Sequence, residues 1–78
     1  MILRQTPTPN EKPWLIMVDS NTSTILHKNG FIPKYISPNG SYIFYVKNNE
    51  LIKFMQDNNL QEIKWTGGVM ILLLHLLH

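Results

Sequence analysis

Residues 37–47 read Ser-Pro-Asn-Gly-Ser-Tyr-Ile-Phe-Tyr-Val-Lys, and the fold is easiest to predict from this stretch. Ser37-Pro38-Asn39-Gly40 predicts a turn, because proline fixes φ at the second position and glycine accepts the positive φ that often follows. Ser41–Lys47 predicts a strand, since nearly all its side chains are β-branched or aromatic. Both faces of this strand are apolar, so both are expected to be covered. We assign Tyr42, Phe44 and Val46 to the core.

The residues before this hairpin predict a strand, a short helix and a second strand. Trp14–Val18 is a continuous apolar run that is typical of a buried strand. Asp19, Ser20 or Asn21 can cap a helix whose inward face carries Ile25 and Leu26, and Asn29-Gly30 can end it. Phe31 then lies where it can fold back on Leu26. Ile32–Ile36 predicts a strand, and Pro33 favours a sheet edge or a strand start.

The residues after the hairpin predict another helix and another strand. Asn48 or Asn49 can cap a helix with Glu50 in its first turn, and Asn58-Asn59 can end it. Its apolar stripe has helical spacing and comprises Leu51, Ile52, Phe54 and Met55. Gln61–Trp65 alternates apolar and polar residues, which predicts a fourth strand.

These elements predict one small α+β domain with the order β-α-β-β-α-β. We expect a three- to five-stranded, mainly antiparallel sheet with two short helices on one face. The order is that of ferredoxin-like folds, although about 52 residues are few for that fold. Residues 1–13 contain three of the five prolines and predict an extended arm. Residues 14–66 form the domain, and residues 67–78 form an apolar segment that is either a helix or an added strand.

The composition excludes several classes of protein. The chain has 78 residues, of which 44% are hydrophobic and 15% charged, so it can fold despite its small size. The absence of cysteine excludes disulfides and thiolate metal sites. A net charge of +2 is too small for a nucleic-acid footprint by charge alone. We expect a cytoplasmic protein, because the start lacks a signal-peptide pattern and the longest apolar run is shorter than a membrane span.

Three short stretches carry a resemblance to a known group of proteins. They are Leu26-His27-Lys28-Asn29-Gly30-Phe31, Tyr42-Ile43-Phe44-Tyr45-Val46 and Glu50-Leu51-Ile52-Lys53-Phe54. Together, over about residues 14–59, they resemble small uncharacterised domains of low-GC Gram-positive bacteria and their phages. The chain departs from the KGF-like corner of those domains by having Asn29 before the glycine. The resemblance implies a phage or mobile-element protein and transfers no functional residue.

The polar residues do not form a pattern that predicts catalysis. His75 and His78 would share a helical face, but a metal site needs a further ligand and the sequence supplies none nearby. His27 is interpreted as a solvated side chain. The five acidic residues are dispersed, and no phosphate-binding glycine loop or nucleophile motif is present. We therefore predict no catalytic residues, no metal, no cofactor and no enzymatic activity.

The leading functional hypothesis is a protein-interaction module that binds a protein partner or self-associates. Residues 69–77 place eight apolar side chains in nine positions, and such a run needs to be buried. Packing against the domain's own sheet, burial in an oligomer or partner, and contact with a membrane surface are the alternatives, of which we favour the first two. The predicted interface residues are Tyr35, Tyr45, Leu73 and Leu76.

A second hypothesis is a single-stranded nucleic-acid accessory module. It would use an aromatic face of the sheet flanked by positive charge, on which bases could stack. The residues that would form this face are Lys34, Tyr35, Tyr45 and Lys47.

Overall fold

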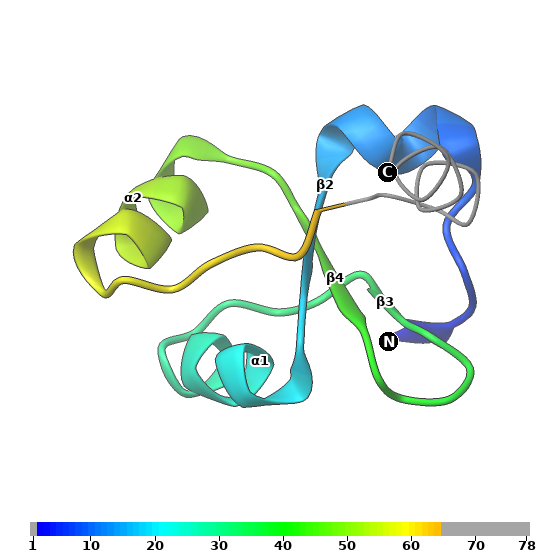
Figure 1. Cartoon of the computed structure of the whole chain (residues 1–78), viewed down its shortest axis with the longest axis horizontal. Helices are drawn as coiled ribbons and strands as arrows, with labels where there is room; N and C mark the ends of the chain where they lie inside the picture. The colour runs from blue at the N-terminus through cyan, green and yellow to red at the C-terminus, as the bar shows by residue number, and fades with distance from the viewer. Residues whose placement is uncertain (1, 65–78) are drawn as a thin grey trace, which may run out of the picture.

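The computed structural model describes residues 2–64, which form a small α+β domain (Figure 1). A four-stranded mixed sheet separates two α-helices from an N-terminal layer that contains a short 3₁₀ helix. The elements in chain order are β1 (Leu3–Arg4), η1 (Pro9–Trp14), β2 (Leu15–Val18), α1 (Ser20–Lys28), β3 (Tyr35–Ile36), β4 (Ile43–Val46) and α2 (Asn49–Asp57). The predicted fold class is confirmed.

The strand order across the sheet is β1-β3-β4-β2. β4 pairs antiparallel with both β3 and β2, with Tyr35 opposite Phe44 and Ile16 opposite Tyr45. β2 and β3 therefore run parallel to each other, with α1 connecting them and β4 inserted between them, which is a split β-α-β arrangement. β1 adds in parallel beyond β3, with Leu3 opposite Tyr35.

Local sequence signals set both ends of α1 as predicted. The Asp19 carboxylate accepts the Thr22 N–H at 2.8 Å and caps the helix N-terminus. At the other end Gly30 adopts φ +91°, and the Phe31 N–H donates to the Leu26 carbonyl at 3.1 Å. This is a Schellman motif, in which the residue after the glycine folds back on the helix. Phe31 packs against the core cluster that contains Leu26.

The ends of α2 follow the same physical rules. The Asn48 side-chain oxygen accepts the Leu51 N–H at 2.8 Å, as the sequence predicted. Asn59 lies in the left-handed region at φ 56°, and the Leu60 N–H donates to the Met55 carbonyl at 2.8 Å. A second Schellman motif therefore ends this helix with asparagine in the position that usually holds glycine. The predicted apolar stripe faces the sheet, since Leu51 and Met55 are buried.

The sheet has a core on each face. The larger core lies under α1 and α2 and contains Ile16, Val18, Leu26, Ile43, Tyr45, Leu51 and Met55. The smaller core contains Leu15, Tyr35 and Phe44, beside the partly buried Met17. The assignment of Tyr42, Phe44 and Val46 to the core is therefore wrong for Tyr42 and Val46, which are exposed. The helices cover the face of β4 that carries Ile43 and Tyr45. The N-terminal layer covers only the centre of the opposite face, around Phe44.

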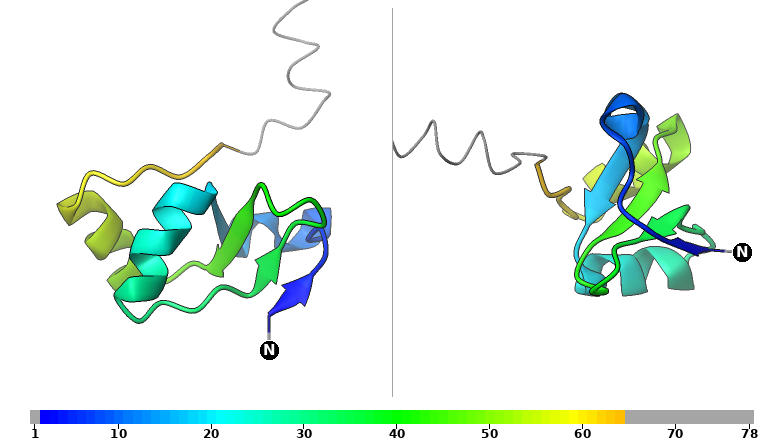
Figure 2. Two further views of the ribbon diagram at one scale, coloured as in Figure 1. Left: turned by 90° about the horizontal axis from the view of Figure 1, so that it is seen from below. Right: turned by 90° about the vertical axis from the view of Figure 1, so that its right-hand side faces the viewer.

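The N-terminal segment is not the extended arm that its prolines predicted. It contributes β1 to the sheet and then crosses the face opposite the helices before entering η1 (Figure 2). η1 begins at Pro9, where the missing N–H of proline costs no hydrogen bond, and the Thr8 N–H donates to Glu11 Oε2 at 3.1 Å. Pro7 is buried in this layer. The segment is thus a packed part of the domain.

The predicted strand at Gln61–Trp65 is wrong over residues 61–64, which have no regular structure. The Ile63 N–H donates to the Met17 carbonyl at 2.7 Å, so the segment does reach the outer edge of β2. The Leu60 N–H is still bonded to the Met55 carbonyl in the motif that ends α2, so the chain is leaving the helix where the strand was expected to begin. The predicted strand Ile32–Ile36 shortens to β3. The apolar segment 67–78 lies outside the described residues.

Candidate interaction surface

Tyr45 lies in the larger core and not on the surface. Its side chain is 2% exposed and packs between β4 and the helices. The phenol oxygen lies 2.7 Å from Ser23 Oγ on α1, so the only polar atom of the side chain has a partner. Burial raises the pKa of Tyr45 above its usual value of 10, because the charged phenolate would lose its hydration. Tyr45 therefore cannot contact a partner without disrupting the core.

Tyr35 is also buried, but on the other face of the sheet. It is 4% exposed and shares the smaller core with Leu15 and Phe44. Its hydroxyl donates to Glu11 Oε1 at 2.8 Å, which connects β3 to η1. This hydrogen bond to a carboxylate is the main reason that the pKa of Tyr35 is raised, with burial second. Tyr35 holds the N-terminal layer against the sheet.

The two tyrosines do not form the predicted aromatic platform. Tyr35 lies opposite Phe44, and Tyr45 follows Phe44 in β4, so the two side chains project from opposite faces. Lys34 and Lys47 are exposed, and Lys34 Nζ lies 5.3 Å from the centroid of the Tyr35 ring. The prediction of a stacking face made by Lys34, Tyr35, Tyr45 and Lys47 is therefore wrong, because the two tyrosines are buried on opposite faces of the sheet. Leu73 and Leu76, the remaining predicted interface residues, lie outside the described residues.

An exposed tryptophan lies at the end of the sheet where β2 begins and β4 ends. Trp14 is 70% exposed although its carbonyl accepts the Lys47 N–H at 2.8 Å, and Val46, opposite Leu15, is 49% exposed. We call Trp14 and Val46 the Trp14 surface. The backbone of Trp14 and Leu15 is held in place, because the Trp14 carbonyl bonds to Lys47 and Leu15 is buried and pairs with β4. This end of the sheet therefore presents a large apolar side chain from a well-held backbone.

Sequence reasoning missed Trp14 because it placed this residue in a buried strand. The run Trp14–Val18 is apolar throughout, and periodicity does not show where such a strand begins. A signal was available in Thr8-Pro9-Asn10-Glu11, which has the spacing of a helix start. A helical turn over 9–14 makes Trp14 the last residue of that turn, before the sheet pairing begins.

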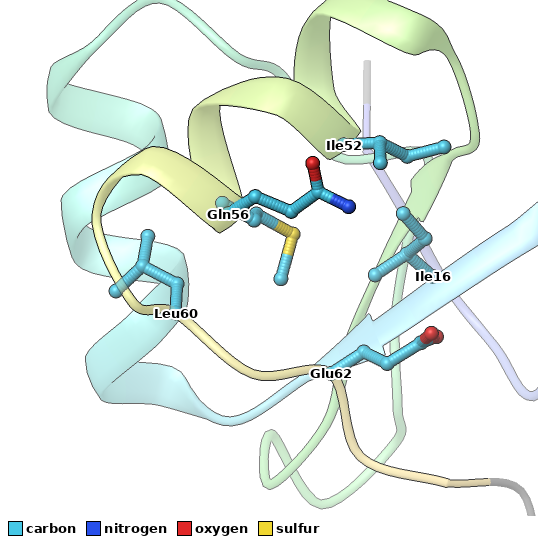
Figure 3. Close-up of a pocket in the computed structure, with 6 residues that line it drawn as sticks. Ile16, Ile52, Gln56, Leu60 and Glu62 are labelled. Atoms are coloured by element: carbon cyan, nitrogen blue, oxygen red, sulfur yellow. The ribbon is translucent and has the colours of Figure 1, made fainter.

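A small apolar cavity lies between α2, β2 and the chain that follows α2 (Figure 3). Its volume is about 140 Å³. Aliphatic side chains form most of its wall, with the Gln56 amide and the Glu62 carboxylate as the polar groups. The lining residues are Ile16, Ile52, Met55, Gln56, Leu60 and Glu62. A cavity of this size and lining suits one branched aliphatic side chain or a benzene-sized group.

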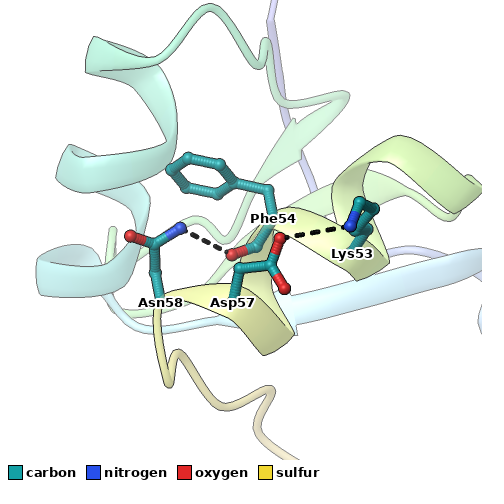
Figure 4. Close-up of polar contacts among 4 residues, drawn as sticks. All are labelled: Lys53, Phe54, Asp57 and Asn58. Carbon is teal, nitrogen blue, oxygen red and sulfur yellow. Dashed lines mark hydrogen bonds and ion pairs between the residues drawn. The ribbon is translucent and has the colours of Figure 1, made fainter.

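The opposite side of α2 carries an open groove that charged side chains and two phenylalanines line together. Lys53 Nζ lies 3.5 Å from Asp57 Oδ2, and the Asn58 amide donates to the Phe54 carbonyl at 2.8 Å (Figure 4). The Phe54 and Phe31 rings lie 5.3 Å apart, which joins α2 to the loop after α1. The ion pair is largely exposed and contributes little to stability. The groove's charged groups are paired or solvated, so it offers no concentrated charge to a ligand.

Neither a metal centre nor a membrane span is present in residues 2–64. No three histidine, aspartate or glutamate side chains of this part of the chain are grouped so that they could hold a metal ion. None of the described helices is both long enough and apolar enough to cross a bilayer. The Trp14 surface and the cavity beside α2 are therefore the features that we consider for binding.

No family model, curated protein or solved structure matches this chain. Its function is therefore inferred from its own residues.

Proposed function

We propose that this protein is a small interaction module that self-associates through the Trp14 surface. The exposure of Trp14 is the observation that carries the proposal, because tryptophan is on average highly buried in single chains. Tryptophan is also enriched among the residues that dominate the energy of protein interfaces. The proposal keeps the apolar and aromatic interface expected from the sequence, with Trp14 replacing Tyr35 and Tyr45.

The surroundings of Trp14 support its role as an anchor. Its carbonyl is held by the Lys47 N–H, and the next residue, Leu15, is buried in the smaller core. A side chain presented from a fixed backbone loses less conformational freedom on binding. Val46 is a second exposed apolar side chain at this end of the sheet, and Lys47, whose N–H bonds to the Trp14 carbonyl, is also exposed. An apolar centre with a polar edge is the usual composition of a protein interface.

Size-exclusion chromatography with light scattering over a range of concentrations tests the proposal. The natural chain should exceed its monomer mass of 9.1 kDa at high concentration. Trp14→Ser should weaken association by about 30-fold, which corresponds to the roughly 2 kcal/mol expected of an interface anchor. Ile32→Ser is the matched control, because Ile32 is 74% exposed but lies in the loop before β3. It should leave association unchanged.

Two results would contradict the proposal. One is a monomer at every concentration, and the other is an equal effect of Trp14→Ser and Ile32→Ser. Ultraviolet absorbance at two wavelengths in the same run detects bound nucleic acid, which would support the alternative function instead. Leu73→Ser with Leu76→Ser tests the remaining predicted interface residues. If these leucines join the interface, the double variant dissociates the oligomer and keeps the circular dichroism spectrum of the domain.

We also propose a cytoplasmic location and an origin in a phage or mobile element. The resemblance of residues 14–59 to small domains of low-GC Gram-positive bacteria and their phages supports the origin. The lack of cysteine fits a reducing compartment.

A further inference from the structure

We propose that the cavity between α2 and β2 is the docking site for a leucine side chain from residues 72–77 of the same chain. The proposal concerns the outer edge of β2 and not the Trp14 surface, so it goes beyond the proposed function. It names an occupant that the sequence itself supplies.

The aliphatic wall of the cavity is incomplete on the side of Ile52 and Leu60, next to the chain that follows α2. Ile16 and Met55 are buried at its base, whereas Ile52 and Leu60 are only partly buried and pack against the larger core from its margin. Gln56 and Glu62 add polar groups to the lining (Figure 3). An aliphatic side chain in this cavity would complete the burial of Ile52 and Leu60 and leave both polar groups at the solvent side.

The described chain ends beside this cavity. Glu62 lines it, and the hydrogen bond from the Ile63 N–H to the Met17 carbonyl holds the next residue against the edge of β2. Seven residues then separate Lys64 from Leu72, and the eight steps between their Cα atoms span about 26 Å when extended. The intervening Thr66-Gly67-Gly68 has the residues of a chain reversal. The leucines of 72–77 can therefore return to the cavity without moving the domain.

The short connection favours the same chain over a second copy. A ligand on a short flexible linker has an effective concentration in the millimolar range. A second copy supplies the same leucines only at the protein's own concentration. At about 10 μM protein the tethered segment is therefore favoured by about 100-fold. Residues 69–77 also lack charged groups apart from His75, so docking an apolar side chain from them leaves few charges to desolvate.

Disulfide trapping in the full-length chain provides the test, and the chain has no cysteine that would interfere. Gln56→Cys places a thiol at the cavity, and Leu73→Cys or Leu76→Cys places its partner in the segment. The control is Ser41→Cys with the same partner, since Ser41 lies in the turn at the opposite end of β4 from α2. At about 10 μM protein, the Gln56→Cys pair should close within the monomer at least tenfold faster than the Ser41→Cys pair.

Three results would overturn the proposal. The first is equal rates for the two pairs, and the second is no closure in either. The third is closure only in covalent dimers, which would assign the cavity to a second copy.

A nuclear magnetic resonance measurement on the natural chain tests the same docking without cysteines. The Met55 methyl signal, assigned by its loss in Met55→Leu, should show nuclear Overhauser contacts to leucine methyls of residues 72–77. Trp14→Ser should leave the closure rate unchanged, so failure of this proposal and failure of the Trp14 interface are distinguishable.

Discussion

Replacing Tyr45 with alanine should cost about 3–5 kcal/mol of the free energy of unfolding, as for other large aromatic side chains in a core. Tyr45 is among the largest fully buried side chains, and it packs with Val18, Leu26 and Leu51 in the larger core. A domain of this length has a total stability of about 4–12 kcal/mol. Tyr45→Ala therefore removes at least about a quarter of the stability and can unfold the chain without denaturant.

Urea denaturation followed by far-ultraviolet circular dichroism measures this cost. Tyr45→Phe is the control, because it keeps the ring and removes only the hydroxyl that bonds to Ser23. It should cost about 0.5–1.5 kcal/mol, the usual net value of one hydrogen bond. Ser23→Ala, alone and combined with Tyr45→Phe, isolates the coupling between the two hydroxyls.

An exposed tyrosine at a partner interface would behave differently. Its removal changes stability by less than about 0.5 kcal/mol when no partner is bound. A cost below about 1 kcal/mol for Tyr45→Ala would therefore refute the assignment of Tyr45 to the core, because even partial collapse of the cavity left by a buried aromatic cannot explain so small a value.

The same denaturation assay tests the helix ends. Asn59→Gly should stabilise the domain by about 0.5–1 kcal/mol, because φ is 56° there. Asn58→Gly is the control and should destabilise the domain, because φ is −109° there. Equal effects of the two variants would contradict a left-handed cap at Asn59. Gly30→Ala should cost about 1–2 kcal/mol of the free energy of unfolding through backbone strain alone, since an added Cβ would contact nothing within 4 Å. An unchanged urea midpoint would disprove the φ of +91°. The hydrogen bond from Thr22 lowers the pKa of Asp19. The Asp19 carboxylate therefore stabilises the folded domain fully above about pH 3.8, and this contribution is lost as the pH falls through the lower folded pKa. Asp19→Asn keeps the cap and should reduce this acid dependence, and an identical pH profile in the variant would exclude the Asp19 charge as its source.

The local parts of the fold could be predicted from the sequence because capping and turn residues act within a few positions. Asp19 and Asn48, each among the predicted cap candidates, cap the helices, and Gly30 ends α1 through its backbone freedom. Gly40 closes the predicted turn at φ +78°, where its N–H donates to the Ser37 carbonyl at 2.9 Å. In each case the residue type and the required conformation are neighbours in sequence.

The placement of the candidate site residues could not be predicted in the same way. Both faces of β4 are apolar, so alternation does not indicate which face the helices cover. That choice depends on α1 and α2 packing on the side of Ile43 and Tyr45, which is a tertiary effect. β1 pairs with β3 over only two residues that lie far away in the sequence, and no local pattern indicates such a pairing.

The two-residue ladder between β1 and β3 makes the N-terminus the first place where the native state should open. The Leu3 N–H donates to the Lys34 carbonyl at 3.3 Å, and beyond this short ladder the Tyr35 hydroxyl bond to Glu11 also ties the layer to the sheet. Among the four strands, amide hydrogen exchange should therefore be fastest in β1 and slowest in β4, which has a strand on each side. Each such opening would uncover Leu15, Tyr35 and Phe44 while the helix-covered core stays closed. The smaller core is thus a transient apolar surface that proteases, chaperones or other copies of the chain can reach. The strength of the ladder between β1 and β3 sets how often it is exposed.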